Sequence, residues 1–149
     1  MTEISKIAID PSINNIGWAV EWQGKVFSGA IETKGVEIEE KLCSLRGLLR
    51  SVLLSPAYPL PSLAVVEQPA PYAFKRSTSE TSGKGLNNAS LQKLNIALGA
   101  IISTLCEVNI REIKLIPVAW KGKMNKKMAM ALTGAKNHNT ADAILLLRY

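Results

Sequence analysis

The chain has 149 residues, 47% of them hydrophobic, and a formal net charge of +6. A chain of this length is expected to form one domain, residues 1–149, with a core of substantial size. No apolar run reaches the length of a membrane span and the N-terminus lacks a signal segment, which predicts a cytoplasmic protein without a membrane partner.

Charge is distributed unevenly along the chain. Residues 1–69 hold 6 Lys and Arg against 8 Asp and Glu, a net charge of −2, whereas residues 70–149 hold 12 against 4, a net charge of +8. A basic half joined to a half that bears acids suits a polyanionic partner such as nucleic acid. A solubilising surface charge is the alternative, and charge by itself does not name a substrate.

Apolar periodicity divides the chain into strands and helices. Strand-like alternation and a turn signal at Gln23-Gly24 dominate the first third, and apolar residues spaced three and four apart indicate the helices. The predicted elements are, in chain order, strands over 4–10, 15–22 and 25–31, a helix over 37–54, a strand over 63–67, a helix over 89–108, a strand over 110–116, and helices over 121–132 and 140–148. This order predicts a mixed α/β sheet with helices on its faces. Cys43 and Cys106 lie within the helical apolar patterns and are expected to be reduced core residues.

The first predicted strand ends in a single carboxylate, Asp10, ahead of the polar turn Pro11-Ser12. Side chains alternate between the two faces of a strand, so Asp10 should share a face with Ala8 and lie over the sheet rather than at its rim. A charge in that place needs a partner, and a divalent cation is the commonest one.

Two further acids stand on separate elements. The strand over 63–67 ends in Glu67, and Asp142 lies in the last predicted helix. Three isolated carboxylates on different elements indicate a metal-dependent phosphodiester enzyme. Each acid also has an ordinary alternative: Asp10 belongs to a strand-end turn, Glu67 is a solvated strand terminus, and Asp142 occupies position N3 of a capping box whose N-cap is Asn139.

The segment over 68–88 contains prolines, glycines and a Ser/Thr/Lys cluster, which predicts a long, mobile connection of the functional or disordered kind. Its aromatic and basic side chains are Tyr72, Phe74, Lys75, Arg76 and Lys84. An ordinary role for Tyr72 and Phe74 is to pin the loop to the body of the domain.

Five motifs occur here in an order and at separations that resemble the RuvC-type Holliday-junction resolvases, particularly their shorter phage-type members. They are Ile9-Asp10-Pro11-Ser12, Gly17-Trp18-Ala19, Val66-Glu67-Gln68-Pro69, the segment from Pro117 to Lys127, and the segment from His138 to Ala143. The resemblance implies a ribonuclease H-like fold, a mixed five-stranded sheet flanked by helices. It also implies an endonuclease of a bacterial or phage-infected cell that resolves four-way DNA junctions as a homodimer by paired symmetric nicks.

In that family four side chains hold two Mg²⁺ ions. The resemblance assigns Asp10 to the acid that bridges both ions, Glu67 to the second acid and Asp142 to the last. The fourth position is normally an Asp or a His three residues before the last acid, and here it is Asn139, a neutral and weaker ligand. His138 lies one helical turn from Asp142 and is the preferred fourth ligand; Asn139, or no fourth ligand at all, is the alternative. A histidine at this place can also transfer a proton. Mn²⁺ should substitute for Mg²⁺.

The resemblance also assigns DNA contacts. Lys121, Lys126 and Lys127 occupy the region in which the family places phosphate-contacting lysines, near the start of a helix whose N-terminal end favours anions. An aromatic residue close behind the second acid packs against opened bases in the relatives, which assigns that role to Tyr72 and Phe74. A solvated helix face is the alternative for the lysines.

Three rival functions accompany this interpretation. The first is another ribonuclease H-like nuclease that acts on branched DNA or hybrids. The second is a non-catalytic junction-binding protein whose metal site is degenerate at Asn139. The third, an actin-like or sugar-kinase fold, is disfavoured because 149 residues cannot hold its two lobes.

Overall fold

The computed structural model describes residues 4–69, 88–118 and 124–149. Its elements are, in chain order, β1 (Lys6–Asp10), β2 (Asn15–Trp22), β3 (Lys25–Glu32), α1 (Ile38–Leu53), β4 (Leu63–Gln68), α2 (Asn88–Glu107), β5 (Glu112–Pro117), α3 (Lys126–Thr133) and α4 (His138–Leu146). Each predicted element is present. The bounds agree to within two residues except at α3, which begins at Lys126 rather than at residue 121.

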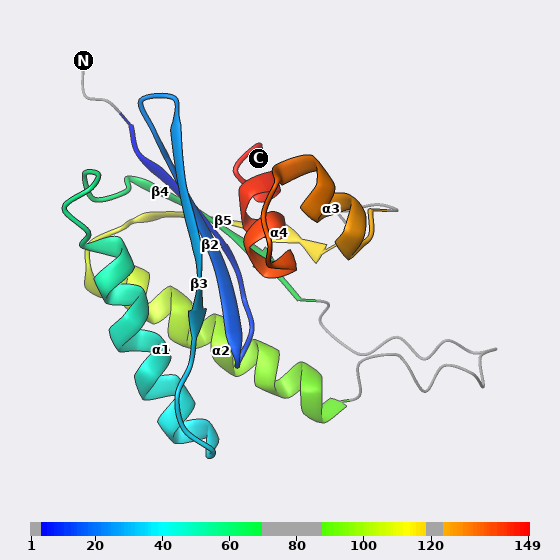
Figure 1. The fold of residues 1–149 in the computed structure, drawn as a ribbon. Helices are drawn as coiled ribbons and strands as arrows, with labels where there is room; N and C mark the ends of the chain where they lie inside the picture. Colours follow the sequence, from blue (N-terminus) through cyan, green and yellow to red (C-terminus); the bar gives the residue numbers. More distant parts are fainter. Residues whose placement is uncertain (1–3, 70–87, 119–123) are drawn as a thin grey trace.

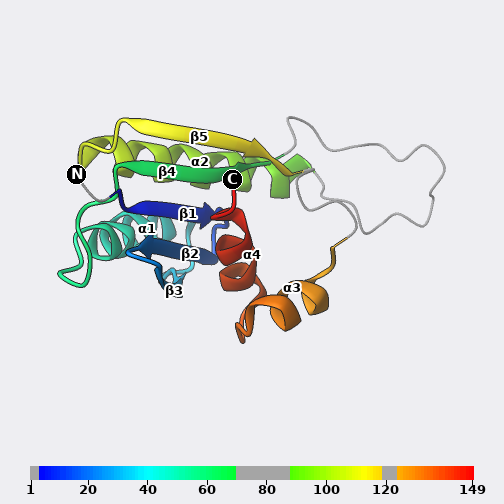
Figure 2. The ribbon, with the colours of Figure 1, turned by 90° about the horizontal axis from the view of Figure 1, so that it is seen from above.

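The five strands form one mixed sheet in the order β3-β2-β1-β4-β5. β1, β2 and β3 are antiparallel neighbours, whereas β4 and β5 run parallel to β1. The carboxyl ends of the three parallel strands therefore meet at one edge of the sheet, as Figure 2 shows from above. The predicted fold class, a five-stranded mixed sheet flanked by helices, is confirmed.

Local sequence explains the turns and helix ends that fix this arrangement. Gln23 and Gly24 both have positive φ, 52° and 74°, as a two-residue hairpin turn of type I′ requires. Asn125 caps α3 by accepting a hydrogen bond from the backbone N–H of Met128 at 2.9 Å. Gly134 ends α3 with a φ of 74°, as predicted, and its N–H donates to the carbonyl oxygen of Met130.

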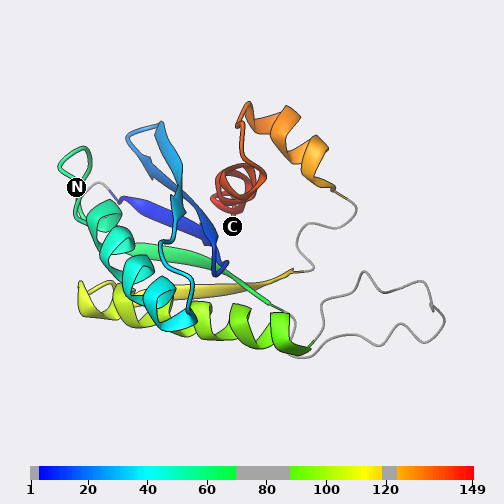
Figure 3. The same cartoon turned by 60° about the horizontal axis from the view of Figure 1, so that its bottom comes forward.

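Helices cover both faces of the sheet. α1 and α2 lie on one face, and α4 lies against the other with α3 beside it (Figures 1 and 3). The main core, between the sheet and the α1/α2 layer, consists of large aliphatic side chains such as Ile7, Ile9 and Ile101. A smaller cluster under α4 consists of Ala8, Ala19, Val65, Ile116, Ala143, Leu146 and Leu147.

Two expectations need correction: that Cys43 and Cys106 are core residues, and that no apolar segment reaches the length of a membrane span. Cys43 and Cys106 are free but exposed, because each lies on the outward side of its helix, so they are not core residues. Within the described part of the chain, one helical segment, Ala89–Glu107, is long and apolar enough to span a membrane by length and composition alone. Core helices of soluble proteins pass the same test, and this helix contributes Ala97, Leu98, Ile101 and Leu105 to the main core.

Candidate active site

A cavity of about 440 Å³ lies at the carboxyl ends of β1 and β4, beneath the N-terminal half of α4. All three acids that the sequence singles out line it, together with both candidates for a fourth ligand. The lining residues are Asp10, Pro11, Glu67, Pro69, Leu94, Val118, Met124, Asn125, Lys126, His138, Asn139 and Asp142.

Strand geometry brings Asp10 and Glu67 to this cavity. Ala8 and Val65 belong to the cluster under α4, so Asp10 and Glu67, two residues further along, lie on the same face. β1 and β4 run parallel with Ile9 level with Val66, which makes Asp10 and Glu67 the next residues on neighbouring strands. Each carboxylate side chain belongs to a residue that is only 7% exposed. Glu67 is therefore not a solvated strand terminus, and Asp10 is equally buried.

Asp142 reaches the cavity from above, on α4. The N-cap of this helix is Asn137, whose side chain accepts hydrogen bonds from the backbone N–H groups of Asn139 (2.8 Å) and Thr140 (3.3 Å). Asn139 is therefore not the N-cap, and Asp142 is the fifth residue of the helix, beyond the reach of a capping box. The alternative that Asp142 is a capping residue is wrong, and its carboxylate, on a residue that is 7% exposed, is a buried group of the cavity wall.

His138 and Asn139 lie one turn before Asp142 on α4, four and three residues away, so both share its side of the helix. Both line the cavity. The side-chain amide of Asn139 donates from Nδ2 to Oδ1 of Asn15 at 3.1 Å, and the Asn137 amide donates to the same oxygen at 3.3 Å. Asn15 thereby fixes the orientation of the Asn139 side chain. The side-chain oxygen of Asn139, Oδ1, is the atom of this amide that can accept a hydrogen bond or bind a cation.

A glycine allows α4 to sit this close to the sheet. Gly17 pairs with Asp10 in the β1–β2 ladder, and a Cβ atom at Gly17 would overlap the backbone carbonyl of Asn139 and lie 2.7 Å from the N atom of Thr140. The hydroxyl of Thr140 donates to the carbonyl oxygen of Gly29 at 3.0 Å, which ties the helix to β3 as well. The seat of α4, made by Gly17, Asn15 and Gly29, thus sets how far Asp142 stands from the strand acids.

The cavity offers oxygen donors, which are the ligands that hard divalent cations prefer. Among the described residues, however, no group of three or more His, Cys, Asp or Glu side chains is gathered closely enough to hold a metal ion by itself. Mg²⁺ commonly takes only one or two carboxylates and completes its shell with water and substrate phosphate. The donor set therefore fits Mg²⁺ bound in part by substrate, and does not fit a closed structural metal site.

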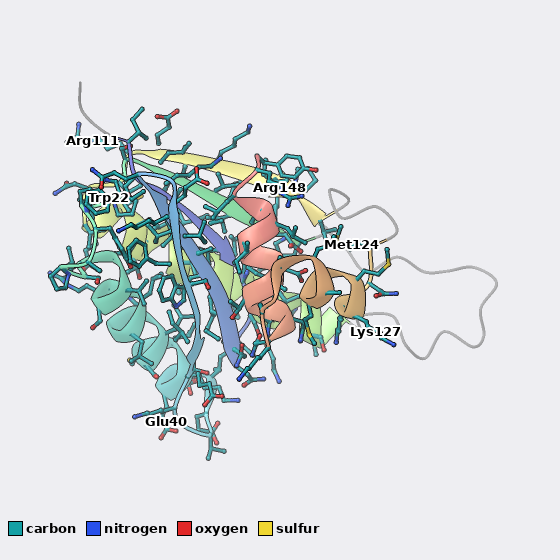
Figure 4. All side chains as sticks on the ribbon, turned by 45° about the horizontal axis from the view of Figure 1, so that its top comes forward. Trp22, Glu40, Arg111, Met124, Lys127 and Arg148 are labelled. Carbon is teal, nitrogen blue, oxygen red and sulfur yellow. The ribbon has the colours of Figure 1, made fainter. Side chains whose placement is uncertain are left out.

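Basic side chains border the cavity on the α3 side. Lys126 lines it, and Lys127 follows at the start of α3, both exposed (Figure 4 shows Lys127 and Met124). The other predicted DNA contacts lie outside the described residues. They are Tyr72, Phe74, Lys75, Arg76, Lys84 and Lys121.

Sequence reasoning missed the residues that build the seat of α4. An isolated glycine inside an apolar strand, as at Gly17, is a signal for close backbone approach, and it could have been used. The role of Asn15 could not be read from the sequence, because its partners are more than 120 residues away. Leu94 and Met124, which supply apolar walls of the cavity, carry no local signal.

No protein-family model matches this chain, and no curated protein sequence matches it. Among solved structures it is similar to T. thermophilus RuvC in complex with a Holliday junction substrate, with a TM-score of 0.66 and 19% identity over 97% of this chain and 90% of that one. The PPX-GPPA enzyme of Aquifex aeolicus gives a TM-score of 0.44 and 12% identity, over 81% of this chain and 38% of the other. The chain therefore has a RuvC-like fold, with three buried acids at the carboxyl edge of its sheet.

Proposed function

We propose that this protein is a Mg²⁺-dependent endonuclease that resolves four-way DNA junctions by paired nicks. One observation carries the proposal. Asp10, Glu67 and Asp142, each buried and each from a different element, line one cavity at the sheet edge where α/β folds bind their ligands. Buried carboxylates are costly, and a divalent cation with a phosphodiester substrate is the chemistry that this arrangement suits.

The acids are proposed to hold two Mg²⁺ ions, with Asp10 in the shared position and Glu67 and Asp142 on either side. When bound, the ions would activate a water molecule and stabilise the leaving 3′ oxygen. His138 is the first candidate for the fourth ligand position, through a ring nitrogen, and Asn139 is the second, through Oδ1. Mn²⁺, which accepts the same oxygen ligands, should substitute.

The remaining groups are proposed to position DNA. Lys126 lies on the cavity wall, where its ammonium group can neutralise a phosphate beside the one that is cut. His138, if it is not a ligand, can hold or transfer a proton at the attacking water or the leaving oxygen. Tyr72 and Phe74 remain candidates for stacking on opened bases, and Lys75, Arg76, Lys84, Lys121 and Lys127 for phosphate contacts. Support for a junction as the substrate comes from the fold shared with RuvC, which was solved on a Holliday junction substrate.

A homodimer is proposed because paired nicks need two sites related by a two-fold axis. The helix α2 is apolar over most of its length, yet only 28% of its apolar stretch is buried within the chain. It therefore leaves apolar surface that a second copy of the chain could cover. Gln92, Ile96, Gly99 and Ser103 form an exposed stripe on it, with Ile96 46% exposed and open space beside Gly99. Ala97, on the other side of this helix, is fully buried in the core of its own chain and does not belong to the stripe.

The test is cleavage of an end-labelled mobile four-way junction, beside a linear duplex of matched sequence, with Mg²⁺ or EDTA. Symmetric nicks in the junction alone, abolished by EDTA and by Asp10→Asn while junction binding persists, are the expected result. Preferential cleavage of flaps, forks or hybrids would reassign the protein to another nuclease activity. Junction binding without cleavage in either Mg²⁺ or Mn²⁺ would make it a binding protein, and would implicate the neutral side chain of Asn139.

A further inference from the structure

A second cavity, of about 540 Å³, adjoins the candidate active site. It lies between the β1–β2 connection and the N-terminal turns of α1 and α2. Its lining residues are Ser12, Ile13, Asn14, Val36, Glu37, Ile38, Lys41, Ser90, Lys93 and Leu94.

The two cavities share a wall. Leu94 lines both of them, and the consecutive residues Pro11 and Ser12 line one each. The two cavities are therefore neighbours, which adjoin at Leu94 and at the Pro11-Ser12 turn.

Two cations from different helices face this second cavity. Lys41, on α1, is partly buried, and its Nζ donates to Oδ1 of Asn14 at 2.6 Å; Lys93, on α2, is exposed. Glu37 is the one acid among the lining residues, so the formal charge of the lining is +1. The lining of the candidate active site contains three acids. The second cavity, whose lining has a net positive charge, is therefore the more favourable of the two for an anion.

Hydroxyl and amide groups complete a lining suited to phosphate oxygens. Ser12 accepts long hydrogen bonds at Oγ from the backbone N–H groups of Asn14 (3.3 Å) and Asn15 (3.4 Å), which leaves its hydroxyl hydrogen for another acceptor. Lys, Ser and Asn side chains are the groups that commonly contact phosphate in nucleic-acid complexes, where they fix register without reading sequence.

We propose that this second cavity is a phosphodiester subsite, in which Lys41 and Lys93 hold a backbone phosphate of the strand that is cut, some linkages away from the scissile one. The proposal rests on the proposed function, because it requires a DNA strand over Asp10. The subsite sets the register of the strand in the active site and contributes affinity that is independent of sequence.

The test compares Lys41→Gln/Lys93→Gln with a control of equal charge, Lys25→Gln/Arg111→Gln. Lys25 pairs with Trp22 at the opposite end of the sheet, where Figure 4 also shows Arg111. Junction binding is measured in the Asp10→Asn background, and a single neutral methylphosphonate linkage is moved along the strand on each side of the scissile phosphate. Lys93→Gln alone is included, because Lys93 is exposed and its replacement should leave the fold intact.

In the protein with both lysines, one neutral linkage outside the scissile position should weaken binding. The double variant should lose sensitivity at that linkage only, and its salt dependence, the slope of log K against log salt, should fall by about 1 for each phosphate that the variant no longer neutralises. Lys93→Gln should show the same change in part. An unchanged linkage profile, or a change equal to that of the control, would overturn the subsite while cleavage by the unmodified protein leaves the proposed function standing. If the unmodified protein neither binds nor cuts DNA, the proposed function fails, and the subsite fails with it.

Discussion

The two faces of β1 differ in what their side chains do. Ile7 and Ile9 point toward α1 and α2 and are fully buried among other large aliphatic residues. Ala8 and Asp10 point toward α4, where the cluster is smaller: it combines three alanines with Val65, Ile116, Leu146 and Leu147, and the backbone of α4 comes close to Gly17. On one face this strand of five residues contributes large side chains to the core under α1 and α2. On the other face its small side chain allows α4 to pack close to the sheet.

The difference shows how a small domain can separate stability from chemistry. Large side chains on the α1/α2 face bury the area that holds the fold together, at roughly 25 cal/mol per Å² of apolar surface. Small residues on the α4 face, among them Ala8 and Gly17, let a helix backbone approach the sheet and bring Asp142 toward the strand acids. Substitutions on the two faces should therefore have different consequences.

The largest effect is expected for Asp10→Asn. Loss of the shared carboxylate should lower the cleavage rate at least about 10³-fold, because metal-assisted stabilisation of the transition state is worth several kcal/mol. Melting in EDTA should show a stability equal to or above that of the unmodified protein, since a buried charge has become neutral. Mg²⁺ should raise the melting temperature of the unmodified protein more than that of the variant.

The matched control for Asp10→Asn is Ile9→Val, one residue away on the opposite face. It should cost about 0.5–1.5 kcal/mol of unfolding free energy and leave the cleavage rate unchanged. A loss of activity in Ile9→Val comparable to that in Asp10→Asn would show that the faces are not separable.

The second prediction compares two glycines. Gly17→Ala forces a methyl group against the backbone of α4 and should cost about 3 kcal/mol, the upper range for overpacking, with loss of cleavage as the helix is displaced. Gly47→Ala, in the middle of α1 with open space around it, should instead stabilise the fold by about 0.5–1 kcal/mol. Denaturant unfolding of both variants measures the change in unfolding free energy, which should be negative for Gly17→Ala and positive for Gly47→Ala. Equal effects would mean that α4 does not rest on Gly17.

The third prediction concerns Asn15, which accepts hydrogen bonds from the side chains of Asn137 and Asn139. Asn15→Ala leaves two amide donors without this acceptor, and should cost about 1–3 kcal/mol. Mg²⁺ affinity should fall about 10–100-fold, as is usual when an orienting partner beside a metal site is removed. Calorimetric titration with Mg²⁺ in the presence of junction DNA measures the latter.

Asn15→Asp is the conservative control for Asn15→Ala, because its carboxylate retains an acceptor oxygen for both amides. It should recover the stability that Asn15→Ala loses. Failure of this rescue would mean that the Asn15 side chain supports the fold in some way other than by accepting these bonds.

The smallest effects are expected at alkaline pH, and they have opposite signs on the two faces. Burial lowers the pKa of Lys6, whose Nζ donates to the carbonyl oxygen of Leu147 at the end of α4. The unfolded chain then binds more protons than the folded one just below pH 10.5, so this residue makes stability rise as the pH increases toward that value. Burial raises the pKa of Tyr58, which packs on Phe27 in the α1 layer, so its contribution is lost as the pH rises above 10.0.

Melting curves between about pH 9 and about pH 11 test these signs. Tyr58→Phe should abolish part of the alkaline loss, and Lys6→Gln should abolish part of the gain below pH 10.5. If both variants follow the unmodified protein at every pH, burial at these two positions does not control their ionisation.

Much of the fold was predictable from sequence because it depends on local pattern. Strand alternation correctly placed Asp10 over the sheet, and apolar spacing of three and four identified the helices. The Gln23-Gly24 turn followed from the backbone preference of glycine. Glu67 was predicted at the end of a strand, and the structure places it there, on a strand whose two faces belong to different clusters.

The errors have a common physical cause, which is that tertiary contacts choose between equal local options. Asn137 and Asn139 are both good N-caps, and contacts of α4 with Asn15 and Gly17 select Asn137. Cys43 and Cys106 fit an apolar stripe, yet the packing of α1 and α2 turns them outward. The second cavity could not be foreseen, because Lys41, Lys93 and Ser12 are brought together only by the topology.

The seat of α4 has a consequence for when the proposed active site is assembled. During synthesis Asp10 and Glu67 emerge well before Asp142, and the sheet that carries the first two cannot fix the third until α4 has docked on Gly17 and Asn15. A nascent or partly opened molecule thus carries acids but no assembled centre. Docking of the last helix therefore completes the proposed active site, and an opening of that helix would separate Asp142 from the strand acids.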